Sequence, residues 1–398
     1  MNLVSDRVKN MAESATLAMA AKAREYKANG IDVISLSLGE PDFKTPKHIQ
    51  EGTKAAIDEE KYFAYPPVNG YLDLREAISV KFKRENGLDY AADQIVVSNG
   101  AKQSIANVMM ALLNEGDEVI VFSPFWVSYT ALIDLAGGKS VFIKGGIEND
   151  FKVTAAQLQS AITNRTKAII YSSPCNPTGS VFTKEELESL ALVLKANPNI
   201  VVIADEIYEH INYTGAHASM GAIEGMLDRT VTINGMAKGF AMTGWRVGYI
   251  GAPLWLAKAC TKIQGQFTSA NSSISQRGAL TALTTDLTPT VEMSKEYLRR
   301  RDFVKELLDE IPGVKTNLPL GAFYFFPDVS DYFGKSDGDN VIKDASDLCI
   351  YILDNAQVSL VTGAAFGDPS CIRISYAASE SDLRKAIGAI KVALAKLS

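Results

Sequence analysis

Lys238 and Arg246 are the two residues whose types and spacing point most directly to chemistry. They lie in a glycine-punctuated segment, 235–246, that follows a strand-like run at Arg229–Ile233. A lysine amine that burial or a neighbouring cation keeps neutral is a nucleophile able to condense with an aldehyde. An arginine eight residues further on shares its pocket if the segment curls back. The alternative is a solvated surface loop, which describes most such pairs, so other parts of the chain must decide.

Polar and aromatic residues also follow four earlier apolar runs. In chain order these segments are Asn99–Ser104, Pro124–Trp126, Pro174–Gly179 and Asp205–Tyr208. Each has an ordinary explanation by itself, such as a turn at Asn176-Pro177, a core aromatic at Trp126 or a helix N-cap at Asp205. Gly100 permits close backbone approach, and the helix after it offers N–H donors to an anion. Because parallel strands end at one edge of a sheet, the agreement of these segments with Lys238 predicts a ligand site there.

The elements that must position these residues are short apolar runs alternating with amphipathic helices. The runs are Ile95–Ser98, Glu118–Phe122, Ala168–Ser172, Ile200–Ala204, Thr230–Ile233 and Val247–Ile250. Such a series predicts an α/β fold with a mostly parallel sheet and helices on both faces.

The alternation stops near Asp286, which predicts a change of domain. A long charged helix, Thr288–Ile311, is followed by apolar strands at Ala322–Phe326, Val358–Val361 and Cys371–Tyr376 and by a closing helix. This pattern indicates a smaller α+β domain. We therefore predict an N-terminal segment at 1–47 that joins the small domain, a large ligand-binding domain at 48–285, and the small domain at 286–398. The tract 335–340 is predicted to be a mobile surface insertion.

Composition narrows the class of protein. The 398 residues are 47% hydrophobic and 22% charged, enough for two domains with substantial cores. A net charge of −6 without a basic block argues against nucleic acid as a partner. The four cysteines form no CxxC pair and no Cys/His cluster, which favours a cytoplasmic location and predicts no metal. Neither a signal peptide nor a membrane span is expected.

Taken together, the motifs resemble those of a known family. They are Ser14–Thr16, Gly39–Phe43, Tyr65, Gly70–Arg75, Asn99–Gln103, Pro124–Tyr129, Ser173–Gly179, Asp205–Glu209, the Lys238 segment and Arg373–Tyr376. In this order and spacing the chain resembles the aspartate aminotransferases of the class I, fold-type-I enzymes that use pyridoxal 5′-phosphate (PLP), in particular their bacterial and archaeal branch. The resemblance covers nearly the whole sequence.

The resemblance implies the catalytic roles. Lys238 would bind the PLP aldehyde covalently and, once substrate displaces it, carry the proton between substrate and cofactor. Asp205 would face the pyridine nitrogen and keep it protonated, while Tyr208 and Asn176 would donate hydrogen bonds to the 3-oxygen. The protein's part in such chemistry is to bind, orient and tune the cofactor.

The resemblance also implies how the rest of the cofactor is held. Trp126 would stack on the ring. The residues around the phosphate would be Gly100, Ala101, Lys102 and Arg246. Tyr65 resembles the tyrosine that reaches the phosphate of the neighbouring subunit, so a homodimer with shared active sites is implied.

Two carboxylate sites are implied for the substrate. Arg373, whose planar fork suits a carboxylate, would bind the α-carboxylate with help from the Gly39 backbone, Trp126 and Asn176. Lys102, with the Ser14 and Thr16 hydroxyls nearby, would bind the side-chain carboxylate. The alternative is that Lys102 serves the phosphate alone.

The implied reaction is transfer of the amino group of L-aspartate to 2-oxoglutarate, giving oxaloacetate and L-glutamate. Relatives that also accept prephenate carry a basic residue where this chain has Ala12, followed by Glu13, so prephenate is not expected as a substrate. The alternatives are an aromatic, alanine or diaminopimelate-pathway aminotransferase, a PLP lyase of similar fold, or a non-catalytic ligand sensor. Such sensors need an added DNA-binding domain, for which the chain has no spare length before Ser14.

Overall fold

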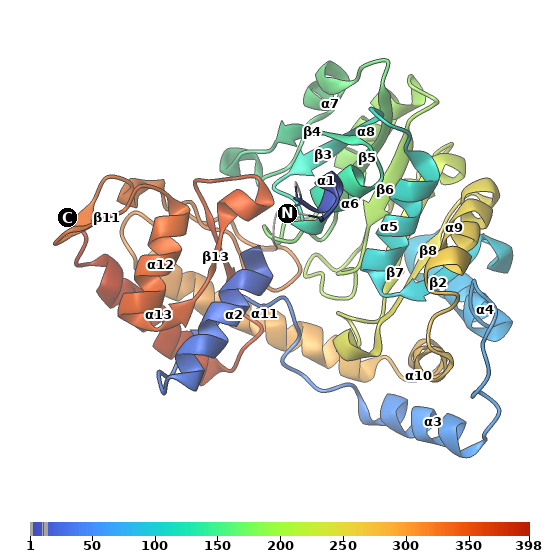
Figure 1. Ribbon diagram of the computed structural model, residues 1–398, viewed down its shortest axis with the longest axis horizontal. Coiled ribbons are helices and arrows are strands. Elements are labelled where there is room, and N and C mark those ends of the chain that lie inside the picture. The colour runs from blue at the N-terminus through green and yellow to red at the C-terminus, as the bar shows by residue number, and fades with distance from the viewer. Residues whose placement is uncertain (1–2, 10, 12–14) are drawn as a thin grey trace.

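A seven-stranded sheet dominates the computed structural model, which describes residues 3–9, 11 and 15–398. Its strands are β2 (Ile95–Asn99), β3 (Glu118–Ser123), β4 (Lys139–Lys144), β5 (Thr166–Ser172), β6 (Val201–Asp205), β7 (Thr230–Gly235) and β8 (Val247–Gly251). They lie in the order β2-β8-β7-β6-β5-β3-β4 (Figure 1). β8 is antiparallel to both neighbours, whereas the other pairs are parallel.

Helices cover both faces of this sheet. They include α5 (Ala101–Leu112), α6 (Ser128–Leu135), α7 (Ala155–Ala161), α8 (Lys184–Lys195) and α9 (Leu254–Phe267). Because side chains alternate along a strand, Val119 and Val121 pack with α5, α6 and α9, whereas Ile120 packs with α7 and α8. Burial on both faces explains why the strands read as continuous apolar runs in the sequence.

A further group of helices packs beside β2 and β8. It consists of α3 (Lys47–Asp58), α4 (Leu72–Lys81) and α10 (Ser273–Thr284). Ile49, Leu74 and Ile78 are fully buried in this cluster. Burial of each such side chain contributes about 1.5–3 kcal/mol to the free energy of folding. α4 continues without a break into a π-helix, η1 (Phe82–Asn86), which ends at Gly87 with a left-handed φ of +69°.

The C-terminal residues build a second, smaller arrangement. α11 (Thr288–Asp309), α12 (Ala345–Ala356) and α13 (Glu380–Leu394) surround a three-stranded antiparallel sheet of β13 (Val361–Thr362), β14 (Ile372–Ser375) and β9 (Tyr324–Phe325). Figure 1 shows α2 (Ala15–Ala28) beside these helices rather than beside the large sheet. The N-terminal β1 (Ile34–Ser35) pairs in parallel with β12 (Val358–Ser359), so both ends of the chain meet here.

The structure differs from the sequence prediction in three local respects. The edge strand β4 was not predicted, and β8 runs against the direction of its neighbours. The tract 335–340 contains a hairpin of β10 (Ser336–Asp337) and β11 (Asn340–Val341), and the Ser336 backbone is hydrogen-bonded to Ser398 at 3.1 Å. The predicted surface insertion therefore has a regular structure of its own, and its mobility stays a prediction.

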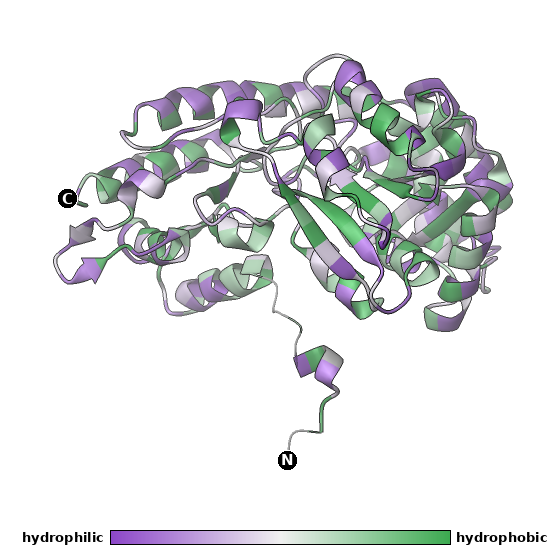
Figure 2. Ribbon diagram, turned by 90° about the horizontal axis from the view of Figure 1, so that it is seen from above, coloured by the Kyte–Doolittle hydropathy of each residue, from purple (hydrophilic) through white to green (hydrophobic). Residues whose placement is uncertain are grey.

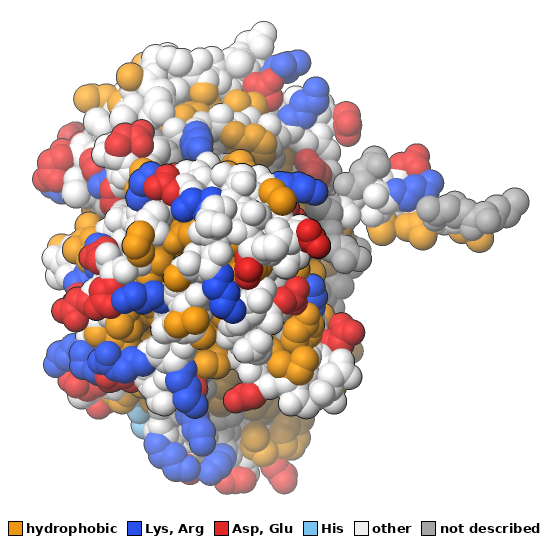
Figure 3. Space-filling view, turned by 90° about the vertical axis from the view of Figure 1, so that its left-hand side faces the viewer, with side chains coloured by type: hydrophobic (Ala, Val, Ile, Leu, Met, Phe, Trp, Pro, Cys, Tyr) orange, Lys and Arg blue, Asp and Glu red, His pale blue; other side chains and the backbone are white. Residues whose placement is uncertain are grey.

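The surface carries charges of both signs. Figure 3 shows Lys and Arg interspersed with Asp and Glu over the face that bears the C-terminal helices. Figure 2 shows α1 (Asp6–Lys9) set apart from the rest of the chain, where Leu3, Val4 and Val8 are exposed. Among the described residues, no helix combines the length and the apolarity that a membrane span requires.

Candidate active site

Lys238 lies just beyond β7, at the edge of the sheet where the parallel strands end. Its Nζ donates a hydrogen bond of 2.5 Å to the Gly39 carbonyl, which belongs to the N-terminal segment. The ring centroids of Tyr208 and Phe323 lie 5.6 and 5.9 Å from Nζ. The segment therefore does curl into the protein, and the interpretation of Lys238 as a solvated surface lysine is wrong.

The charge on Lys238 is destabilised by its surroundings. Burial lowers the pKa of the amine to about 8, and Arg373 and Arg246 lower it as well, whereas Glu40 and Asp205 act in the opposite direction. At pH 7 about one amine in ten is then neutral, compared with about one in three thousand for an ordinary lysine. The site thus keeps a fraction of nucleophilic amine at neutral pH.

Asp205 forms the end of β6 and is only 5% exposed. Its Oδ2 accepts a hydrogen bond of 2.6 Å from the Tyr129 hydroxyl, and its Oδ1 accepts one of 3.3 Å from the Ile207 backbone N–H. Burial raises the pKa of the carboxyl to about 6, while the hydrogen bond from Tyr129 opposes this rise. Asp205 is therefore ionised at neutral pH and oriented by donors on both oxygens.

Arg373 lies on β14 and is 2% exposed. Its Nη1 donates to Asn176 Oδ1 at 2.9 Å, and its Nη2 donates to the Ser37 carbonyl at 2.6 Å. The guanidinium carbon lies 4.6 and 4.7 Å from the ring centroids of Tyr324 and Phe366. Its buried Nε has no hydrogen-bond partner among the described residues. A rigid cation with unused donors at such a position is suited to a carboxylate.

Three positive features converge at the start of α5. The N-cap Gly100 has a left-handed φ of +84°, which favours glycine, and a Cβ added there would lie 2.4 Å from Arg246 Nη2, so a larger residue would also displace the guanidinium. The Nζ of Lys102 lies 5.1 Å from the Trp126 ring centroid, and burial together with Arg246 lowers its pKa. Backbone N–H groups from Ala101 onward add the positive end of the helix dipole. The arrangement can bind a small anion such as a phosphate.

Other predicted residues lie at different distances from this centre. Tyr208 is buried, and its hydroxyl is 2.7 Å from that of Tyr324. Thr16 is half-buried on α2, next to Ala15, which packs in a cluster with Phe366. Tyr65 is 94% exposed. Ser14, Ala12 and Glu13 lie outside the described residues.

Three contributors were missed at the level of sequence. Tyr129 binds Asp205, and Tyr324 binds Tyr208, although both tyrosines read as core aromatics. Asn271 donates from Nδ2 to the Arg246 carbonyl at 2.6 Å and to Asn99 Oδ1 at 2.9 Å, which fixes the backbone of the anion site. A signal that could have found Tyr129 is its place at the end of the Pro124–Tyr129 motif, three residues after Trp126.

Comparison with known proteins agrees with this geometry. Residues 31–390 match the family model of class I and II aminotransferases. The chain belongs to this family. As an aminotransferase of this class, it depends on PLP and acts on amino acids and 2-oxo acids.

Relatives of the aminotransferase are similar over nearly its whole length. A bifunctional aspartate aminotransferase and glutamate/aspartate-prephenate aminotransferase of Petunia hybrida is 47% identical, covering 98% of this chain and 82% of its own. The crystal structure of the aspartate aminotransferase of Rhizobium meliloti is 39% identical, with a TM-score of 0.96 and all of both chains covered. The aspartate aminotransferase of Thermus thermophilus with maleate is 40% identical, with a TM-score of 0.92, covering 99% of this chain and all of its own.

The residues of this aminotransferase fit PLP. A partly neutral amine at Lys238 suits the aldehyde, and an ionised Asp205 suits a protonated ring nitrogen. The close approach of Gly100 and Arg246 and the start of α5 suit the phosphate.

Proposed function

We propose that this aminotransferase converts L-aspartate and 2-oxoglutarate into oxaloacetate and L-glutamate. The observation that carries the proposal is that Lys238 lies close to both Asp205 and Arg373. The charges of these two residues act on the pKa of the Lys238 amine. An amine for proton transfer, a carboxylate for a cationic ring and a cation for an acid substrate are the groups that transamination requires. The names of the full-length relatives support aspartate as the amino donor.

Each group has a distinct part in the proposed mechanism. PLP, when bound, supplies the aldehyde that captures the amino group and a ring that accepts an electron pair. The residues that would hold it are Lys238, Asp205, Tyr208, Asn176, Trp126, Gly100, Ala101, Lys102 and Arg246. Once the amine of Lys238 is free, its neutral Nζ takes the proton from the substrate Cα and later returns a proton. The ionised Asp205 holds the proton on the ring nitrogen throughout. Positioned proton transfer of this kind is worth about 10² to 10⁴ in rate.

Substrate selection rests on two cations in this proposal. Arg373 binds the α-carboxylate, assisted by Asn176 and the backbone at Gly39. Asn176 accepts from Arg373, and the Gly39 carbonyl accepts from Lys238. Lys102, with Thr16 and Ser14, binds the second carboxylate. Maleate, the ligand named for the Thermus thermophilus structure, is likewise a dicarboxylate. An aromatic or alanine aminotransferase would leave the charge of Lys102 without a partner in the substrate.

The substrate assignment is tested by comparing kcat/KM for aspartate, glutamate, phenylalanine and alanine as amino donors. We expect aspartate to exceed phenylalanine and alanine by about 10- to 100-fold, since a hydrogen bond to a charged group is worth about 1.5–3 kcal/mol. Prephenate should be a poor acceptor beside 2-oxoglutarate. A preference for an uncharged side chain would contradict the role given to Lys102. Efficient prephenate turnover would contradict the inference drawn from Ala12. Bound PLP without turnover of any amino acid would favour the alternative of a non-catalytic ligand sensor.

The lowered pKa of Lys238 predicts how PLP capture depends on pH. Only the neutral amine attacks an aldehyde, so the rate at which the cofactor-free protein captures PLP should rise about tenfold per pH unit below 8 and level off above it. The measurement is the amount of borohydride-trapped PLP as a function of time between pH 6 and 10. A rate that keeps rising to pH 10 would indicate an ordinary lysine.

We also propose that the enzyme is a cytoplasmic homodimer with shared active sites. Tyr65 and Phe63 are 94% and 65% exposed, which suits a tyrosine that reaches a partner's phosphate. All four cysteines are free, which suits a reducing compartment. Sedimentation equilibrium decides the assembly: a monomer that retains full activity would exclude a shared site. Cell fractionation decides the location.

The domain division remains a proposal, with a segment at 1–47, a large domain at 48–285 and a small domain at 286–398. The pairing of β1 with β12 supports it, as do the two hydrophobic clusters of the large sheet, which contain no residue beyond 285. Limited proteolysis should cut near 285; protection there with cleavage inside 95–251 would argue against it.

A further inference from the structure

A buried group of charges lies beside the Asp205–Tyr208 segment, between its glutamates and the end of α4. Lys81, the last residue of α4, is completely buried, and Glu206 and Glu209 are 1% and 8% exposed. Charged residues are almost never buried to this extent unless they are paired. None of the residues at this location belongs to the mechanism proposed above, so their burial needs another explanation.

The π-helix η1 brings two donors of this group together. A π-helix places residues five apart on one face, whereas an α-helix would separate them. The Nζ of Lys81 accordingly donates to Asn86 Oδ1 at 2.7 Å, five residues further on. Gly87, with its left-handed φ, then ends the helix, so that Lys81 and Asn86 both face the chain that follows β6.

Lys81 and Asn86 bind both carboxylates of that chain. Lys81 Nζ donates to Glu209 Oε1, and Asn86 Nδ2 donates to Glu209 Oε2 at 2.6 Å and to Glu206 Oε2 at 3.1 Å. Glu206 Oε2 also accepts 2.7 Å and 2.9 Å contacts from Ser219 Oγ and His217 Nε2. One amide thus connects two glutamates on either side of Ile207-Tyr208.

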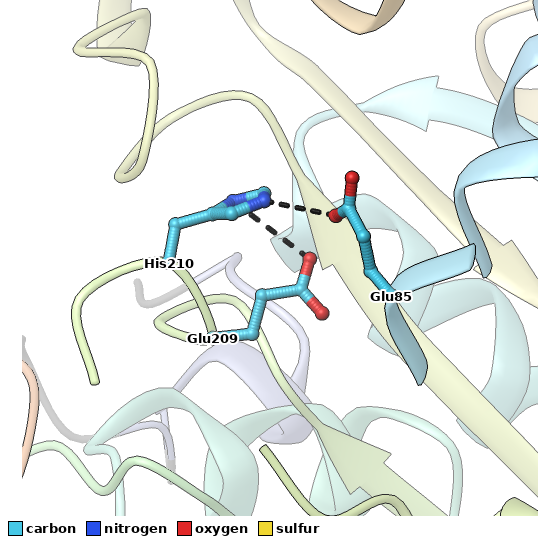
Figure 4. Close-up of side chains that lie close together, drawn as sticks. All are labelled: Glu85, Glu209 and His210. Carbon is cyan, nitrogen blue, oxygen red and sulfur yellow. Dashed lines mark hydrogen bonds and ion pairs between the residues drawn. The ribbon is translucent and has the colours of Figure 1, made fainter. Parts of the chain in front are cut away.

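The cluster is not a metal site, although its spacing would suit one. Figure 4 shows His210 directed at both Glu85 and Glu209, and the carboxylate and imidazole atoms of this group lie within 4.8 Å of one another. The place of a cation is already taken, because Lys81 forms ion pairs with Glu209 and, at 3.5 Å, with Glu85. The amide N–H₂ of Asn86, a donor only, points at the same carboxylate.

The ion pairs outweigh the cost of burying Glu209. Burial alone would raise the pKa of its carboxyl, but Lys81, His210 and His217 lower it to about 2. Glu209 is therefore a permanent anion at neutral pH. Because a buried charge that loses its partner is strongly destabilised, the Lys81–Glu209 pair restrains the backbone on which Tyr208 is carried.

We propose that Lys81 and Asn86 are positioning residues for the cofactor: by binding Glu206 and Glu209 they hold the Asp205 carboxylate and the Tyr208 hydroxyl in the geometry that PLP requires. This proposal rests on the cofactor roles proposed for Asp205 and Tyr208. The two glutamates lie directly beside those residues in sequence, and the Glu209 N–H closes the turn by donating to the Glu206 carbonyl at 3.0 Å. Movement of Glu206 or Glu209 therefore moves Asp205 or Tyr208, the proposed cofactor ligands.

The test compares PLP binding by three variants in cofactor-free protein, followed by quenching of tryptophan fluorescence. Lys81→Met should weaken PLP binding by at least about tenfold, since two hydrogen bonds from a charged group are lost. Lys83→Met is the matched control, because Lys83 is an exposed lysine of η1 whose ion-pair partner among the described residues is Asp89, and PLP binding by this variant should be unchanged. Lys81→Met/Glu209→Gln should recover most of the affinity, because the Gln amide is uncharged and can donate to Asn86 Oδ1.

Each outcome decides the proposal. Equal PLP binding by Lys81→Met and the wild type would overturn it, as would a double variant no better than the single one. Failure of the wild type to bind PLP would instead refute the proposed function. If Lys81→Met does not fold, hydrogen exchange in the wild-type protein decides. PLP should slow amide exchange at 82–87, whose π-helix gives Lys81 and Asn86 their positions, and unchanged exchange there would overturn the proposal.

Discussion

Replacing Lys238 by Ala is expected to abolish covalent attachment of PLP and to reduce turnover by at least about 10² to 10⁴, the usual worth of positioned proton transfer. The reason is that Lys102, the other lysine of the described site, lies elsewhere: it is over Trp126 at the anion site, while Lys238 faces Tyr208 and the Gly39 carbonyl. The measurements are kcat for aspartate and the mass of the protein after borohydride reduction.

The fold should survive this change, which makes the result interpretable. Lys238 and Gly39 are both only half-buried, and the Gly39 carbonyl is the one acceptor of Lys238 Nζ among the described residues, so few buried contacts are lost with the side chain. We therefore expect thermal unfolding of the cofactor-free variant to match that of the wild type. Substantial turnover by Lys238→Ala would mean that another group moves the proton, and the role assigned to Lys238 would be wrong.

The second large effect is expected at Arg373. Arg373→Met should lower kcat/KM for aspartate by about 10² to 10⁴, since two hydrogen bonds between a guanidinium and a carboxylate are each worth about 1.5–3 kcal/mol. Arg373→Lys keeps the charge but not the planar fork, so its kcat/KM should fall between those of Arg373→Met and the wild type. The affinity for PLP should change much less than kcat/KM, because Arg373 is assigned to the substrate alone.

Removal of Arg373 also leaves two hydrogen-bond acceptors without their donors. Asn176 Oδ1 and the Ser37 carbonyl would lose their donors in a buried place, which costs about 1–3 kcal/mol each. A lower Tm is therefore expected, and PLP content must be measured beside kcat/KM. Loss of PLP in parallel with activity would place Arg373 in the structure of the cofactor site, and unchanged kcat/KM would exclude it from substrate binding.

Much of the site could be predicted from the sequence because it follows directly from strand ends. Asp205 and the segment of Lys238 come after apolar runs, and parallel strands bring such residues to one edge. The direction of β8 could not be predicted, since a hydrophobic run has the same pattern whichever way it points. β4 was missed because it is an edge strand with exposed lysines at both ends.

The positioning groups were harder to find because they look like core or surface residues. Tyr129 and Tyr324 read as core aromatics, and only three-dimensional packing places their hydroxyls on Asp205 and Tyr208. Lys81 reads as a solvated helix lysine, although it lies on the buried face of α4 with Leu74 and Ile78, and only the structure shows that Asn86 and Glu209 accept from its ammonium. The functional roles of the site residues stay predictions, which the variants above address.

The contact between Arg373 and the Ser37 carbonyl spans 336 residues of sequence. On a ribosome it cannot form until almost the entire polypeptide has emerged, whereas the residues from Gly100 to Arg246 that surround Lys238 are made much earlier. In a nascent chain, Lys238 and the anion site at the start of α5 are therefore made before Arg373 can bind the Ser37 carbonyl. The proposed seat of the α-carboxylate is thus among the last parts of the site that synthesis supplies.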